Sequence, residues 1–121
     1  NENKLDRLNK VAREAAKQCM RSRAPKVVYF DNFTSALKSA EGYENKLFAC
    51  EFAKSSDAYI MNISGSTALV IGSEGGFSDK EFAFAKDSGF YGVTLGKRIL
   101  RAETAAICLL SLVAFALGEL K

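Results

Sequence analysis

The sequence of 121 residues contains no histidine, and Pro25 is its only proline. Without histidine the chain lacks the usual general base, most zinc sites and any Ser/His or Cys/His nucleophile arrangement, so we expect no metal. With a single proline, no proline-rich linker divides the chain. Three cysteines stand far apart without a CxxC pair. They favour buried thiols in a reducing cytoplasm over a disulfide framework.

The chain also lacks a signal peptide and a long hydrophobic run. Its longest apolar stretch, residues 105–117, is too short to cross a bilayer, so we expect a cytoplasmic protein without a membrane partner. Hydrophobic residues make up 48% and charged residues 26%, which is typical of one folded domain over residues 1–121. The chain does not begin with Met, and we expect a fragment of a longer protein.

Charge is unevenly distributed along the chain. Residues 1–26 contain eight Lys and Arg against three Asp and Glu, whereas the remainder contains nine against eleven. A basic segment on a near-neutral body suits a phosphate-rich partner. The solvated face of an amphipathic helix accounts for the same pattern.

Periodicity and turn signals predict alternating helices and strands. Apolar residues recur every three or four positions from Leu5 to Cys19, which predicts a helix ending near Arg23, ahead of Pro25. Further helices are expected from Asp31 or Thr34 to Leu37, over 78–88 behind a Ser78–Glu81 capping box, and over 102–118. β-branched and aromatic runs predict strands at 26–30, 45–52, 66–72 and 90–96.

This alternation predicts an α/β domain with a mainly parallel sheet flanked by helices. In such sheets ligands bind beyond the carboxyl ends of the strands. If strands 66–72 and 90–96 lie side by side, the loops that follow them share one rim and form a pocket. The closing helix is apolar almost all round, so we expect it to be buried on more than one side, within the domain or against another subunit.

Three stretches carry the candidate chemistry. In "IGSEGGFSDKE" (71–81), three glycines precede a helix start, which permits close backbone approach by a ligand and equally fits a structural turn. In "LGKRILRAETAA" (95–106), apolar residues stand between two arginines, as in an apolar wall for a flat ring, although surface ion pairs fit as well. "KQCMRSRAP" (17–25) ends the basic helix with arginines suited to phosphate, or simply to the helix dipole.

In this order, "KQCMRSRAP", "ACE", "IGSEGGFSDKE" and "LGKRILRAETAA" resemble the ribosomal RNA (uracil-N3)-methyltransferases of the RsmE type, a branch of the SPOUT superfamily. The resemblance implies an α/β knot fold with a C-terminal trefoil knot, S-adenosylmethionine as cofactor, and a homodimer. It implies methyl transfer to N3 of a uridine in small-subunit (16S) ribosomal RNA or the assembled subunit. Ser73 departs from the proline common in the family, which loosens that turn. The family's usual N-terminal β-barrel (PUA-like) RNA-binding domain is absent from this chain, so we expect the catalytic domain alone.

The resemblance also implies site residues, position by position. Arg101 would stabilise the uridine anion, and Glu103 or Glu74 would take its proton. Arg21, Arg23 and Arg98 would contact RNA. The cofactor-binding positions are Ala49, Cys50, Glu51, Ile71, Gly72, Glu74, Gly75, Gly76, Leu95, Gly96, Arg98, Ile99, Leu100, Arg101, Thr104 and Ala105. A non-catalytic RNA-binding module of the same fold, and an unrelated nucleotide-binding α/β domain that uses the glycines as an anion cradle, remain alternatives.

Overall fold

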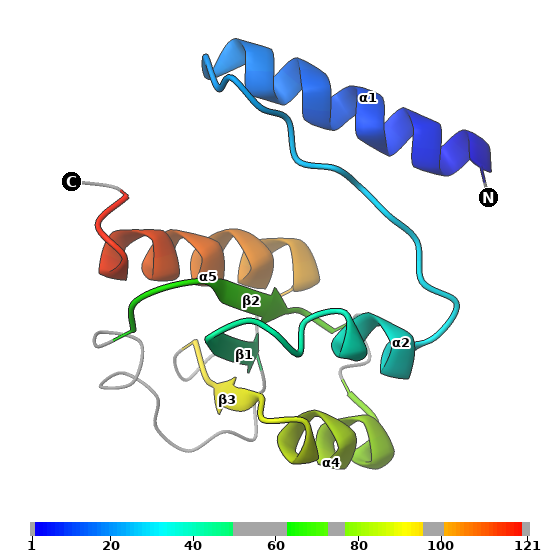
Figure 1. Cartoon of the computed structure of the whole chain (residues 1–121), viewed down its shortest axis with the longest axis vertical. Coiled ribbons are helices and arrows are strands. Elements are labelled where there is room, and N and C mark those ends of the chain that lie inside the picture. The colour runs from blue at the N-terminus through cyan, green and yellow to red at the C-terminus, as the bar shows by residue number, and fades with distance from the viewer. Residues whose placement is uncertain (1, 50–62, 73–76, 96–100, 120–121) are drawn as a thin grey trace. The chain divides into compact units, whose positions relative to one another are not determined.

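The computed structural model describes residues 2–49, 63–72, 77–95 and 101–119. The chain divides into two compact units, Asn1–Asn32 and Phe33–Lys121. The first unit contains one helix and an extended segment, and the second contains a sheet with helices on both faces (Figure 1).

The first unit is built on helix α1, Glu2–Gln18. It ends earlier than predicted, because Met20 adopts the left-handed conformation (φ 62°) and the chain turns there. The backbone N–H of Arg21 donates to the carbonyl of Ala16 (2.8 Å) and that of Met20 to Lys17 (3.2 Å). This pair of bonds is a Schellman motif, with methionine at the position that glycine usually holds.

The predicted strand at 26–30 does not form. Within the first unit, Asn9 on α1 holds the backbone of Val27 instead, accepting from its N–H (2.8 Å) and donating to its carbonyl (3.0 Å). The side chains of Val28, Tyr29 and Phe30 are exposed. The β propensity of this run is therefore not realised, because the described part of the chain pairs no strand with it.

The sheet of the second unit has three parallel strands, β1 (Asn45–Ala49), β2 (Thr67–Val70) and β3 (Tyr91–Val93), in the order β2-β1-β3. The prediction of an α/β fold with a parallel sheet is confirmed. Strands β2 and β3 do not lie side by side, so the condition considered for strands 66–72 and 90–96 is not met, since β1 lies between them. Asn45 explains part of this order, because its side chain donates to the carbonyl of Ser64 (2.7 Å) and to Thr67 Oγ1 (3.2 Å), which fastens β2 to β1.

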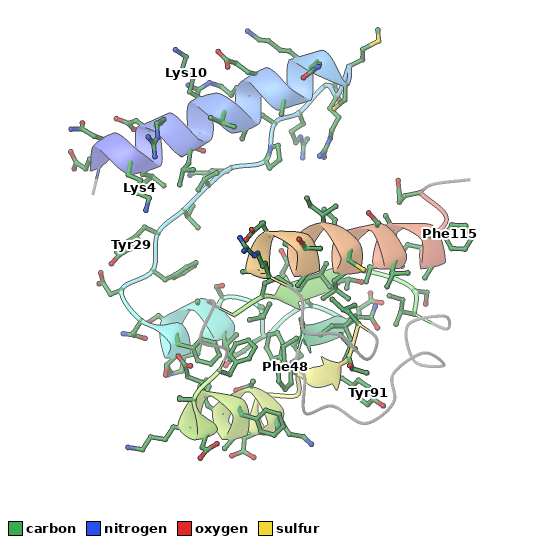
Figure 2. All side chains as sticks on the ribbon, turned by 180° about the vertical axis from the view of Figure 1, so that it is seen from behind. Lys4, Lys10, Tyr29, Phe48, Tyr91 and Phe115 are labelled. Carbon is green, nitrogen blue, oxygen red and sulfur yellow. The ribbon has the colours of Figure 1, made fainter. Side chains whose placement is uncertain are left out.

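Two hydrophobic layers cover the sheet. On one face, α5 (Ala102–Ala116) contributes Leu109 and Val113 to an aliphatic cluster with Leu47 and Val93. On the other face, α2 (Phe33–Lys38) and α4 (Asp79–Asp87) enclose an aromatic cluster around Phe48 (Figures 1 and 2). Alternation along β1 explains the two layers, because Leu47 and Phe48 point to opposite faces.

All three helices predicted in this unit are present, and the bounds predicted for α4 are met to within one residue. Helix α2 starts at Phe33, so neither Asp31 nor Thr34 directly precedes it, and α5 ends at Ala116 rather than 118. The Ser78 hydroxyl accepts from the N–H of Glu81 (3.1 Å) and the Glu81 carboxylate accepts from the N–H of Ser78 (2.9 Å), which completes the capping box of α4. The same helix ends before Gly89, whose φ of +88° suits glycine. No helix in the described ranges is long and apolar enough to cross a membrane.

Candidate functional site

The carboxyl ends of the three strands lie together at one edge of the sheet. Phe48 is in register with Val70, and Ala49 is in register with Val93, so the three strands finish at the same level. Ala49, Ile71 and Leu95 follow or end these strands, and all three pack, half-buried, against the cluster beneath α5. The structure therefore brings together three of the predicted cofactor positions from three separate stretches of sequence.

The glycine stretch is anchored on both sides. Before it, β2 leads through Ile71 to Gly72, which is half-buried. Behind it, the ring of Phe77 contacts the rings of Phe33 (centroids 5.8 Å apart) and Phe48 (5.6 Å). The α4 capping box then follows at once. These anchors set the two ends of the stretch at the carboxyl edge of the sheet.

The start of α5 carries four further predicted residues. Arg101 is the N-cap, exposed and in extended conformation, and its side chain makes no capping hydrogen bond. Its carbonyl accepts from the N–H of Ala105 (2.8 Å). Glu103 and Thr104 are exposed in the first turn, whereas the Ala105 side chain is buried toward the core. Arg101 and Glu103 thus offer a guanidinium and a carboxylate to solvent within one turn of helix.

The remaining predicted site residues lie outside the described residues: Cys50, Glu51, Glu74, Gly75, Gly76, Gly96, Arg98, Ile99 and Leu100. Arg21 and Arg23, predicted to contact RNA, are exposed in the turn after α1, in the first unit. Among the described residues, no group of three or more His, Cys, Asp or Glu side chains lies close enough together to hold a metal ion.

A groove that the sequence reasoning missed runs beside β2. Its volume is about 670 Å³, and its lining includes residues 67–72, Phe33, Ala36, Phe77 and Glu81. The one signal in the sequence is the largely apolar run through β2, which is typical of a strand buried on both faces. The groove reaches Gly72 at the carboxyl edge of the sheet.

Comparison with known proteins identifies one matching family and several similar proteins. The family model described as RNA methyltransferase domain matches residues 1–114. Ribosomal RNA small subunit methyltransferase E of Mesomycoplasma hyopneumoniae is 41% identical over 110 residues, which are 91% of this chain and 48% of that protein. The chain therefore spans about half the length of this curated relative.

Two solved structures resemble the fold. The crystal structure of ribosomal RNA small subunit methyltransferase E from Neisseria gonorrhoeae, bound to S-adenosyl methionine, matches with a TM-score of 0.85 at 30% identity, over 96% of this chain and 49% of that one. A Legionella pneumophila protein assigned as a methyltransferase, in complex with the bound cofactor SAM, matches with a TM-score of 0.84 at 33% identity, over 95% and 47%.

Proposed function

Because the chain belongs to the RNA methyltransferase domain family, we propose that residues 1–121 are the catalytic domain of an S-adenosylmethionine-dependent methyltransferase. Its substrate is a uridine of small-subunit (16S) ribosomal RNA, methylated at N3. The names of the relatives and the cofactor bound to the solved neighbours support this proposal.

The observation that carries the proposal is the common level of the three strand ends. Parallel sheets bind ligands beyond these ends, and here Ala49, Ile71 and Leu95, at or just after the strand ends, pack against one cluster. In our proposal the cofactor lies there. Leu95, Ile99 and Leu100 wall its adenine, while Gly72, Gly75 and Gly76 leave room for its ribose and methionine parts.

The cofactor supplies an electrophilic methyl group on a sulfonium, and the chain supplies positioning and charge. Arg101 stabilises the negative charge that develops on the uracil ring when N3 loses its proton. The proton passes to the carboxylate of Glu103 or of Glu74. The exposure of Arg101 and Glu103 in the first turn of α5 supports their availability to a large substrate.

RNA contact belongs to the same proposal. Arg21 and Arg23, together with Arg98, bind phosphates of the ribosomal RNA or assembled small subunit, since guanidinium groups suit bidentate phosphate contact. The exposure of the first two supports this role. The protein acts in the cytoplasm, where such a substrate is found.

The finer architecture is also proposed. The C-terminal part of the domain forms the trefoil knot of the SPOUT superfamily, and the protein is a homodimer. The exposed side chains of α5 support the dimer: Ile107, Leu110 and Phe115 are 69%, 60% and 53% exposed, an apolar surface unusual for a monomer.

Cofactor binding tests the proposed site directly. Titration with S-adenosylmethionine in a calorimeter should give a binding isotherm that Gly72→Val or Leu100→Asp abolishes. Gly42→Val is the matched control, because a side-chain carbon at Gly42 meets no atom within 4 Å. An unchanged isotherm for Gly72→Val and Leu100→Asp would remove the site from this edge.

Turnover tests the reaction. Transfer of a labelled methyl group to a 16S ribosomal RNA fragment or to small subunits should occur with the wild-type chain. RNA binding with a steep salt dependence and no transfer would instead identify a non-catalytic RNA-binding module. Competition by ATP without any binding of S-adenosylmethionine would identify an unrelated nucleotide-binding domain.

A further inference from the structure

The turn after helix α1 holds a methionine in a backbone conformation that methionine disfavours. Met20 has a φ of 62°, and in the described part of the chain no other residue except glycine has a positive φ. In this left-handed region the Cβ of an L-residue lies too close to the following carbonyl oxygen, whereas glycine enters it freely. Glycine at position 20 would therefore form the same Schellman turn with less strain.

Packing within the chain does not explain why the methionine is there. Its side chain is 91% exposed, the highest value among the large hydrophobic residues that the structure describes. The turn is held by backbone groups, since the N–H of Met20 donates to the carbonyl of Lys17 and the N–H of Arg21 to that of Ala16. Strained residues that the fold does not need are typical of functional sites. A contact with another molecule accounts for Met20.

The chain around Met20 is cationic. Residues 15–30 contain four Lys and Arg and no Asp or Glu, and Arg21 and Arg23 follow the methionine closely. Every residue from 17 to 23 is exposed. Such a turn attracts a polyanion. The apolar surface that a polyanion such as RNA offers is the flat face of an unstacked base, so cations and methionine together fit one ligand.

We propose that Met20 contacts the face of an unstacked base of the RNA while Arg21 and Arg23 bind neighbouring phosphates. This inference rests on the proposed function, in which the two arginines bind ribosomal RNA, and adds a contact that reads a base rather than the charge of the backbone. The thioether of methionine is polarizable and makes favourable contacts with aromatic rings. Methionine is also among the apolar side chains that nucleic-acid-binding proteins place against base steps. Met20 would position the RNA and take no part in the methyl transfer itself.

A contact with a second copy of the chain is the competing explanation, because exposed methionines also suit protein interfaces. The charge of the turn argues against it. In a symmetric contact the same patch of both subunits meets, and here that would bring like charges together. The observations therefore favour RNA, and the experiment separates the two partners.

Substitution by glycine tests the proposal, because it relieves strain and removes the side chain at once. Met20→Gly should keep or raise the thermal midpoint of unfolding. Its affinity for a single-stranded fragment of 16S ribosomal RNA, measured by fluorescence anisotropy, should fall about fivefold. Met20→Leu retains an apolar side chain and should bind like the wild type. Val11→Ala removes another exposed apolar side chain from α1 and should leave RNA affinity unchanged.

Salt and base pairing distinguish a base contact from a phosphate contact. Met20 is uncharged, so Met20→Gly should leave the slope of log affinity against log salt unchanged, whereas Arg21→Gln should reduce it by about 0.7. Annealing the RNA fragment to its complement stacks the bases and hides their faces. Wild type and Met20→Gly should then bind the duplex equally, and an equal loss of affinity for both forms of the RNA would contradict a base contact.

The remaining outcomes separate this inference from the proposed function. Equal affinity of wild type and Met20→Gly for the single strand, with methyl transfer by the wild type intact, would overturn the inference alone. A wild-type chain that neither binds nor methylates ribosomal RNA would overturn both. A lower thermal midpoint for Met20→Gly, or a lower sedimentation mass, would assign the methionine to a protein contact, against our proposal.

Discussion

Helices α4 and α5 cover opposite faces of the same sheet but are stabilised by different interactions. Helix α4 begins with a complete capping box and ends before a glycine, and its outward positions include Lys80, Lys86 and Asp87. Helix α5 begins at Arg101 without a capping hydrogen bond from that side chain, and its outward positions include Ile107 and Leu110. Local sequence signals thus specify α4, whereas burial stabilises α5.

The difference has a functional consequence. A helix that does not depend on its first turn for capping can present that turn to a substrate, and Arg101 and Glu103 occupy it. A helix with apolar residues on its outward face gains further stability when a second subunit covers it. Helix α5 therefore combines the proposed chemistry and the proposed dimer in one element.

The largest expected effect concerns the inner face of α5. Leu109 is fully buried, and Leu109→Ala should lower the free energy of unfolding by roughly 2–5 kcal/mol through lost burial and a residual cavity. Chemical denaturation measures it. Lys80→Ala on the exposed side of α4 is the control, expected within about 0.5 kcal/mol of wild type. A small effect of Leu109→Ala would mean that α5 is not held by burial.

The second largest effect is expected for a substitution on the outer face of α5. Leu110→Glu places a charge on the surface proposed for the dimer and should halve the mass measured by analytical ultracentrifugation. Ala83→Glu makes the matching change on the exposed side of α4 and should leave the mass unchanged. A wild-type chain that sediments as a monomer contradicts the proposed homodimer.

Loss of the α4 cap should have a moderate effect. Ser78→Ala removes the acceptor for the N–H of Glu81, so the free energy of unfolding should fall by about 1 kcal/mol. Ser78→Asp retains an N-cap acceptor and should restore most of it. If both variants unfold like wild type, the capping box contributes little in this chain.

The smallest effect on stability is expected at the start of α5. Arg101→Ala removes no capping hydrogen bond and should change the free energy of unfolding by less than about 0.5 kcal/mol. It should nevertheless reduce methyl transfer to RNA by about 100-fold or more, the range seen when a single charge-stabilising donor is lost. Normal transfer by this variant would exclude Arg101 from the proposed chemistry.

The sequence located most of the helices and strands, but it predicted a strand at 26–30 that does not form and did not give the order of the strands in the sheet. The capping box, Gly89 and the apolar runs are local signals, and the helices and strands that they predicted are present. The segment 26–30 has equal β propensity without a described partner, and so it remains unpaired. The order of the strands could not be predicted either, because strands that follow one another in the sequence need not be neighbours in a sheet.

The candidate site likewise combines features that the sequence determines with features that only the fold decides. The sequence by itself determined the composition of the three stretches, the class of the fold and the two distinct kinds of helix, because these depend on residue type and short-range spacing. Only the tertiary structure decided that β1 lies between β2 and β3, that Ala49, Ile71 and Leu95 meet on one cluster, and that β2 is left at an edge beside a groove. Those relations depend on contacts between residues far apart in the chain, and no local pattern records which of several possible contacts buries the most apolar surface.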